Sequence, residues 1–260
     1  CATRIRDAID KQVDGQFATA SADPSRTTLR GHTHRHTQRN PYIDVLLSGW
    51  MNDDIDQPIT EWEDMFLPRE LLTQVEALEY KNERGEMVKL EPTTEVLYKS
   101  TRTEPPNMPA SKWWWTGMLG IVLGLLGFGF ARKHQETDGA KWRRLLGTQH
   151  FFIGLLFGIP GLVSVLFHFT DHKLTWMNEN MLLWSPLTFL ALVLSLPVMR
   201  GSMWALRTMR FCWSVMAVTS VVAVVMQVLP IFEQENGFML TMLVPFNLLM
   251  AAGFWGYTRD

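Results

Sequence analysis

Two things are scarce in this sequence: cysteine and, over its second half, charge. Only Cys1 and Cys212 are present, and Cys212 lies inside an apolar run, so we expect no intramolecular disulfide. Of the charged residues, 33 lie within residues 1–112 and only 17 in the 148 residues after them. This distribution is not that of a soluble domain throughout. It is typical of a soluble region joined to a membrane domain.

The chain also lacks a signal sequence, an initiating methionine and internal repeats. It opens directly on a helix-like segment in which Ile5, Ala8, Ile9 and Val13 recur every three or four residues. The 112 residues before the apolar half have modest apolar content, so we do not expect them to form a complete hydrophobic core by themselves. We therefore interpret the chain as the C-terminal part of a longer protein.

The second half contains long runs without Asp, Glu, Lys or Arg. Crossing about 30 Å of hydrocarbon takes about 20 apolar residues in a helix. Five stretches qualify, at residues 113–131, 145–170, 181–199, 211–232 and 238–257. They are apolar on all sides rather than on one face, which favours a membrane bundle over a buried soluble core. We predict about five transmembrane helices within residues 113–260.

The loops between these stretches alternate in basic residues. Counted in order, the four loops carry five, one, three and no basic residues. The basic residues are Arg132, Lys133, Lys141, Arg143, Arg144, then Lys173, then Arg200, Arg207 and Arg210. Because Lys and Arg accumulate in cytoplasmic loops, we expect loops one and three and the C-terminus inside, and the soluble region outside.

The soluble region is expected to be a mixed α+β fragment over residues 1–100, followed by a proline-rich linker at 101–112. Helices are predicted at 1–16, from Thr60 with a capping box to Glu63, and at 70–80. Residues 17–25 are expected to be a loop and 80–86 a turn. Two short strands are expected at 87–90 and 95–98.

Four segments resemble one bacterial membrane-protein family. Residues 1–10 (CATRIRDAID) are similar to the Cys-containing motif of proteins with an N-terminal periplasmic domain akin to the Lnb-type lipoprotein N-acylation transacylases. The basic run 28–37, the segment 58–68 (PITEWEDMFLP) and the loop residues 169–180 also agree with that family.

The resemblance implies a permuted papain-like fold for the periplasmic domain. It implies that Cys1 is a nucleophile paired with a histidine from a Gly-His motif upstream of Cys1, so that the half of the domain that carries this histidine is absent from this chain. It further implies acyl transfer through a thioester in the bacterial inner membrane, with membrane lipids and a lipoprotein or acyl-lipid substrate as partners. It implies no cofactor and no nucleic-acid partner.

The residues around Cys1 suit that chemistry. A thiol at a helix N-terminus is acidified by the helix dipole, and its thiolate attacks an ester carbonyl. Arg4, Arg6 and Asp7 are interpreted as supports that anchor this helix, or as arginines that contact a lipid phosphate. Two other interpretations of Cys1 stay open: an ordinary residue at a cut site, and a lipidated N-terminal cysteine.

His32, His34 and His36 alternate along the basic run. In a strand, alternation places three imidazoles on one face, but the outer two lie too far apart to close easily on a zinc ion. We therefore predict no metal site and interpret the segment as a solvated basic stretch facing anionic lipid headgroups.

The outer loop after the second stretch carries ionisable and polar groups: His168, Asp171, His172, Asn178 and Glu179. Such groups near a membrane interface are either hydrated or used. We interpret them as a polar lip that positions a lipid or acyl substrate. Two rival functions remain open, a peptidoglycan amidase or peptidase and a non-catalytic membrane scaffold. Five spans argue against the first of these, because a wall hydrolase needs only one anchor.

Overall fold

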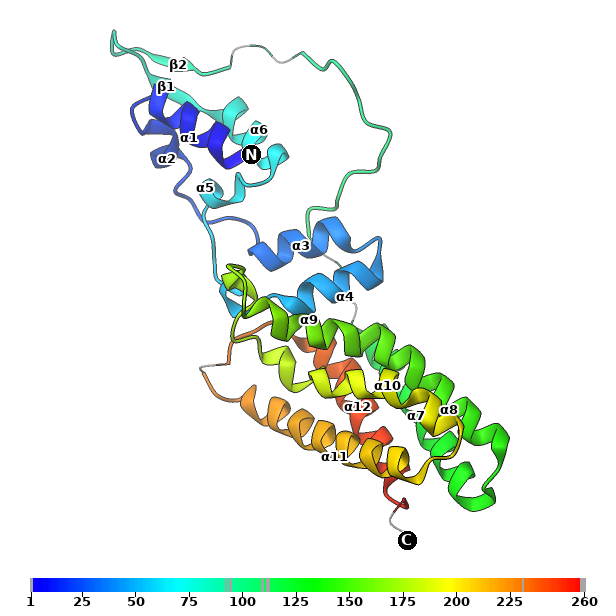
Figure 1. The fold of residues 1–260 in the computed structure, drawn as a ribbon. Helices are drawn as coiled ribbons and strands as arrows, with labels where there is room; N and C mark the ends of the chain where they lie inside the picture. The colour runs from blue at the N-terminus through cyan, green and yellow to red at the C-terminus, as the bar shows by residue number, and fades with distance from the viewer. Residues whose placement is uncertain are drawn as a thin grey trace. The chain divides into compact units, whose positions relative to one another are not determined.

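The computed structural model describes residues 2–91, 93, 95–108, 110, 113–230 and 232–257. It is mainly helical (Figure 1) and divides into two compact units. The N-terminal unit comprises Cys1–Gln38 and Ile55–Pro109, and the bundle unit comprises Arg39–Asp54 and Ala110–Asp260. The chain thus enters the bundle unit briefly and returns before its long apolar half begins.

The N-terminal unit contains six helices or helical turns and one hairpin among its described residues. These are α1 (Ala2–Gln12), α2 (Gln16–Ala20), α3 (Leu29–Thr37), α5 (Glu61–Asp64), α6 (Pro68–Ala77), β1 (Glu79–Lys81), β2 (Met87–Lys89), and η1 (Asp53–Asp56), which crosses the boundary between the units. Its apolar core is small, with Val13, Phe17, Met65, Leu71 and Leu78 buried together.

Local signals explain several of these element boundaries. Gly15 has φ of +78°, a conformation open to glycine, and it separates α1 from α2. The capping box is confirmed: the Thr60 hydroxyl accepts from the Glu63 amide at 3.3 Å, and the Glu63 carboxylate accepts from the Thr60 amide at 2.8 Å. The expected loop over 17–25 is partly wrong, because α2 buries Phe17 in the core.

The strand prediction is half correct. β2 forms where the first strand was expected, but it pairs antiparallel with β1, so that Tyr80 lies opposite Val88. Residues 95–98 form no strand. A strand needs a neighbour to accept its backbone hydrogen bonds, and here the neighbour is the segment directly before the 82–86 turn.

The bundle unit contains α4 (Pro41–Trp50) and the elements from residue 113 onward. The latter are α7 (Trp113–Thr137), α8 (Ala140–Ile153), η2 (Gly154–Gly158), α9 (Ile159–Phe167), η3 (Lys173–Thr175), η4 (Glu179–Leu182), η5 (Pro186–Thr188), α10 (Phe189–Met199), α11 (Met203–Met226) and α12 (Gly237–Phe254). α8, the π-helical turn η2 and α9 form one continuous helical segment that is long enough to cross a membrane. The π-helical turn, where the helix is wider, ends two residues before Pro160.

Four helices in the described part of the chain are long and apolar enough to cross a membrane: Trp113–Thr137, Ala140–Phe167, Met203–Met226 and Gly237–Phe254. The expected continuous helix over 181–199 is wrong. Lys173–Leu182 and Pro186–Met199 are bent by 66° at a break, and they make a fifth span only if counted together. Proline at the start of η5 and the Ser185 cap interrupt the helix there.

Glycines let the bundle helices approach closely. A Cβ on Gly120 of α7 would lie 1.9 Å from the Met242 carbonyl oxygen of α12, and one on Gly154 would lie 2.2 Å from the Leu192 amide of α10. Small residues at such contacts allow backbones to pack without a hydrophobic driving force between helices. Glycines therefore allow close packing of α7 against α12 and of η2 against α10.

Helix α4 belongs to the bundle unit although more than 60 residues separate it from α7 in the sequence. A Cβ on Gly49 would lie 2.6 Å from the Trp184 ring, and the Trp50 indole donates to the Pro160 carbonyl at 3.0 Å. Val45 and Leu46 join the buried apolar cluster of the bundle. An apparently soluble segment is therefore an integral part of the helical bundle.

Candidate functional site

Cys1 lies outside the described residues, and α1 comes directly after it. The helix is held to α5 by Arg6. Its guanidinium donates to the Trp62 carbonyl at 2.9 Å and lies 4.0 Å from the centroid of the Trp62 ring. Combined hydrogen bonding and cation–π contact fix the orientation of this helix within the unit.

The other predicted supports of α1 are less engaged. Asp7 pairs with Arg6 at 2.7 Å, but the Asp7 side chain is 58% exposed. Arg4 is exposed. Arg6 thus performs the anchoring role that the sequence assigned to all three residues, and a solvated pair such as Arg6–Asp7 adds little to stability.

The three histidines lie in a helix, and the interpretation of the basic run as a solvated stretch is wrong at Arg30, His32 and Arg35, which are buried. They belong to α3, which begins where the Thr28 hydroxyl accepts from the Gly31 amide. In a helix, residues two apart point to different sides, so His34 does not share a face with its neighbours. Nowhere in the described chain do three His, Cys, Asp or Glu side chains come together to hold a metal ion.

His32 is fully buried, and both of its ring nitrogens are engaged. Arg35 donates to Nδ1 at 2.8 Å, and Nε2 contacts the Asp64 carboxylate. Because a guanidinium only donates, Nδ1 accepts and the proton lies on Nε2, facing Asp64. Ser25 donates to the second Asp64 oxygen at 2.6 Å. His32 is therefore a link in a buried polar network.

The same network extends to α6. Arg35 reaches the Glu70 carboxylate at 3.2 Å and the Pro106 carbonyl at 2.7 Å, and Arg26 also pairs with Glu70. The network thus connects α3 with α5 and α6. Sequence reasoning missed this network. One signal was available, because His32 and Arg35 are three residues apart and share a helix face once the segment is helical.

His36 is the exposed histidine of α3. Partial desolvation, together with the positive charge of Arg35, lowers its pKa below the ordinary histidine value. Its imidazole is therefore neutral at neutral pH, which leaves it able to accept a proton. Among the three histidines, His36 is the most exposed.

The predicted polar lip divides into two groups. Asn178 is buried, and its amide donates to the Gly49 carbonyl of α4 at 2.8 Å. Asn180 donates to the same oxygen at 3.2 Å. Gln234, from the segment between α11 and α12, donates to the Met51 carbonyl at 2.8 Å. These three amides fasten the end of α4 to two loops of the bundle, and sequence analysis missed two of them.

Glu179 joins the same cluster at its rim. Its carboxylate accepts from the side chains of Gln227 at 3.3 Å and Asn236 at 3.4 Å, and its backbone amide donates to Gln234 at 3.0 Å. Glu179 therefore ties the loop before α10 to the segment that joins α11 and α12. We call this group of side chains the amide cluster: Asn178, Asn180, Glu179, Gln227, Gln234 and Asn236.

The remaining predicted lip residues are not part of this cluster. Nδ1 of His168 is hydrogen-bonded to the Ser164 carbonyl at 2.9 Å, and Nδ1 of His172 is hydrogen-bonded to the Thr170 hydroxyl at 2.9 Å. Asp171 and His172 are exposed, and His168 is half-buried. The structure thus separates a structural amide cluster from a second group formed by His168, Asp171 and His172.

No protein-family model matches this chain, and neither a curated protein nor a solved structure matches it. The family resemblance carried by residues 1–10 therefore stays a prediction. Two features of the described chain bear on chemistry: a helix anchored directly after Cys1, and a histidine network that is already saturated.

Proposed function

We propose that this chain belongs to an inner-membrane, cysteine-dependent acyltransferase of the lipoprotein-modifying type. The observation that carries the proposal is the position of Cys1, which directly precedes an anchored helix and opens the CATRIRDAID motif. Partial positive charge at a helix N-terminus favours the thiolate, which is the nucleophilic form of cysteine.

The proposed reaction has two transfers. The Cys1 thiolate attacks the ester carbonyl of an acyl lipid, a thioester forms, and the released alkoxide takes a proton. An amine of the acceptor then attacks the thioester, an amide forms, and the thiolate is regenerated as the amine loses a proton. Both proton movements need a general base and acid close to the sulfur.

His32 is unsuited to that role because Arg35 and Asp64 occupy its two ring nitrogens. By the family resemblance, the base is a histidine of a Gly-His segment upstream of Cys1, and the N-terminal unit is one part of a permuted papain-like fold. The 260-residue chain by itself is then expected to be inactive. Turnover by the purified chain that disappears in Cys1→Ser would place the base within it, with His36 as the first residue to test.

The acyl intermediate gives a direct test. The natural protein that contains this chain, incubated with a lipoprotein or phospholipid acyl donor, should yield a Cys1 peptide with an added acyl mass that hydroxylamine removes. Cys1→Ala should lower the rate by about 10⁴-fold or more, because a covalent route loses its nucleophile. Cys212→Ala is the matched control, since that thiol is buried in α11.

Other outcomes of this experiment assign the rival functions. Release of peptidoglycan fragments without any acyl adduct would favour a wall amidase or peptidase. An unchanged rate in Cys1→Ala would remove the enzymatic proposal and leave a non-catalytic membrane scaffold.

The location in a bacterial inner membrane and the orientation are part of the same proposal. The basic residues at the α7–α8 and α10–α11 connections support a cytoplasmic position for both. An alkaline phosphatase fusion after Glu235 should be active and one after Lys141 inactive. Phosphatase activity from the Lys141 fusion would reverse the orientation.

A further inference from the structure

Helices α8 and α10 of the bundle unit pack closely side by side (Figure 1). A Cβ on Gly147 of α8 would lie 2.3 Å from the Met199 side chain and 2.7 Å from the Ser195 carbonyl oxygen of α10. Farther along the second span, Gly154 meets Leu192 in the same way. The contact thus advances along one helix as it recedes along the other. The two helices are antiparallel, and the start of α8 lies beside the end of α10.

Each of the two helices carries an arginine next to this contact. Arg144 precedes Gly147 by three positions and Arg200 follows Met199 by one, which are rotations of about 60° and about 100° around the two helix axes. Because the helices run in opposite directions, both rotations lead to the same side of the contact. Both arginines are exposed, which is consistent with the outer side of the bundle.

Helical spacing extends both outer faces along the two helices. We call the resulting surface the α8–α10 strip, and its exposed residues are Arg144, Thr148 and Phe151 on α8, and Val193, Leu196 and Arg200 on α10. The strip is cationic at one end and mainly apolar beyond it. Phe151 is 41% exposed, Leu196 50% and Val193 54%, so this apolar surface has no protein cover within the described chain.

The cationic end of the strip is not neutralised by the protein. No ion pair or hydrogen bond between described residues engages the guanidinium of Arg144 or Arg200. Helices α8, α10 and α11 contain no Asp or Glu. Their ends on this side of the bundle unit add four further basic residues, Lys141, Arg143, Arg207 and Arg210. Such a field attracts an anion.

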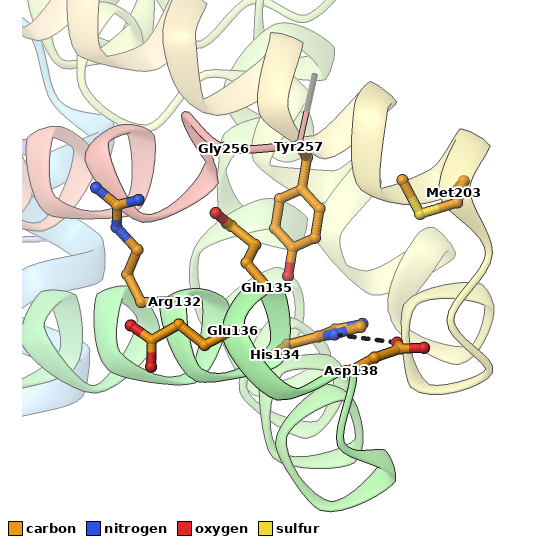
Figure 2. Close-up of a pocket in the computed structure, with 8 residues that line it drawn as sticks. All are labelled: Arg132, His134, Gln135, Glu136, Asp138, Met203, Gly256 and Tyr257. Atoms are coloured by element: carbon orange, nitrogen blue, oxygen red, sulfur yellow. Dashed lines mark ion pairs between the residues drawn. The ribbon is translucent and has the colours of Figure 1, made fainter. Parts of the chain in front are cut away.

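A pocket at the same end of the bundle unit differs in charge. Its volume is about 410 Å³, and Figure 2 shows the residues that line it: Arg132, His134, Gln135, Glu136, Asp138, Met203, Gly256 and Tyr257. Two carboxylates, those of Glu136 and Asp138, belong to this lining, so an anion would meet like charge there. The α8–α10 strip is therefore the more favourable place for an anion.

The order of charge and apolar surface along the strip matches one kind of ligand. Exposed apolar side chains on a span contact acyl chains, whereas arginines near the end of a span reach the level of the lipid headgroups. We propose that the strip binds an anionic phospholipid that has no ammonium group. Its phosphate diester lies between Arg144 and Arg200, and an acyl chain lies along Phe151 and Leu196. Neither Cys1 nor the amide cluster takes part, so this binding is independent of the proposed acyl transfer.

Native mass spectrometry of the full chain tests this assignment. The protein in detergent is offered equal amounts of phosphatidylglycerol, phosphatidylethanolamine and phosphatidylcholine with identical acyl chains. We expect phosphatidylglycerol to be retained about tenfold over the other two, a difference of about 1.4 kcal/mol. The other two lipids carry an ammonium group, which would meet the cations of the strip. Equal retention of the three lipids would overturn the proposal.

Two substitutions locate the preference on the strip. Arg144→Gln and Arg200→Gln should each remove most of it, because each deletes one charge-assisted contact to the phosphate. Arg132→Gln is the matched control, since it removes the same charge from an exposed arginine at the same end of the bundle unit, on α7. The control should keep the preference. An equal loss in all three variants would show that net charge and not the strip selects the lipid, and would overturn the proposal.

A competition arm separates the phospholipid from a soluble phosphate ester. Glycerol 3-phosphate carries the phosphate without acyl chains. Added at the concentration of the lipid, it should leave phosphatidylglycerol bound, because it gains nothing from the apolar part of the strip. Displacement of the lipid by glycerol 3-phosphate would overturn the assignment to a phospholipid.

Discussion

The N-terminal unit and the helices from residue 113 onward bury polar groups in opposite ways. In the N-terminal unit, Arg30 and Arg35 are buried and meet the carboxylates of Asp56 and Glu70. In the described part of residues 113–257, every buried polar side chain is Ser, Thr, Asn, Gln or His. Full charges are costly inside hydrocarbon, so a membrane-spanning helix favours neutral polar side chains whose hydrogen bonds are satisfied by backbone carbonyls.

The units also differ in how their elements come together. The N-terminal unit has few apolar core residues, and its buried polar side chains connect α3 with η1, α5 and α6. The bundle unit instead relies on glycines that remove side chains from helix contacts. The stability of the N-terminal unit is therefore expected to fall when a buried charged side chain is removed, and that of the bundle unit when a larger side chain replaces a glycine.

The largest effect is expected from Asp64→Ala. It leaves His32 and the Ser25 hydroxyl without their shared acceptor, and each buried donor left unsatisfied in this way typically costs about 1–3 kcal/mol. Hydrogen exchange measured by mass spectrometry on peptides of α3 should show loss of protection. Asp7→Ala is the control, because the exposed Arg6–Asp7 pair contributes at most about 1 kcal/mol. Equal effects of the two variants would contradict the proposed contrast between the units.

A somewhat smaller effect is expected from Gly120→Leu in α7. The new side chain meets the Met242 backbone at once, and overpacking of this kind costs about 1–3 kcal/mol. Gly129→Leu in the same helix is the control, because nothing lies within 4 Å of its Cβ position. Thermal unfolding in detergent, followed by tryptophan fluorescence, should show a lower midpoint for Gly120→Leu alone. A lowered midpoint in both variants would assign the effect to helix composition rather than to the contact with α12.

The smallest effect is expected in the amide cluster. Asn178→Ala removes the donor to Gly49 and the acceptor for Asn180 and Gln234, which is worth about 1–2 kcal/mol for one buried polar group. Amide exchange in α4 should accelerate while exchange in α12 stays unchanged. His172→Ala, an exposed position in the same loop, should leave both rates as they are. If α4 exchanges at its original rate in Asn178→Ala, the cluster does not hold that helix.

Local and compositional signals were sufficient for much of the fold. The Thr60–Glu63 capping box and the first and last membrane-length helices all follow from short-range patterns. The segment 181–199 failed because composition does not show where a helix bends: Pro186 and the Ser185 cap break it within an apolar run.

The candidate site was less predictable. The alternation of His32, His34 and His36 did not show that this segment is a helix, which the Thr28 cap and the burial of His32 against Asp64 favour. Pairing between residues about 30 positions apart leaves no periodic trace in one sequence. The same limit applies to Asn180 and Gln234, whose partners lie in α4 and the segment directly after it.

The sequence by itself determined that this protein has a charged first part and an apolar helical second part, because burial in hydrocarbon forbids charge over about 20 consecutive residues. Tertiary structure alone decided that α4 joins the bundle, that His32 is saturated and that both ring nitrogens of His134 are buried without a hydrogen-bond partner among the described residues. Those outcomes depend on which distant carbonyls, carboxylates and rings surround a side chain. A polar residue's own identity specifies what it can bond, but only its packed neighbours specify whether it does.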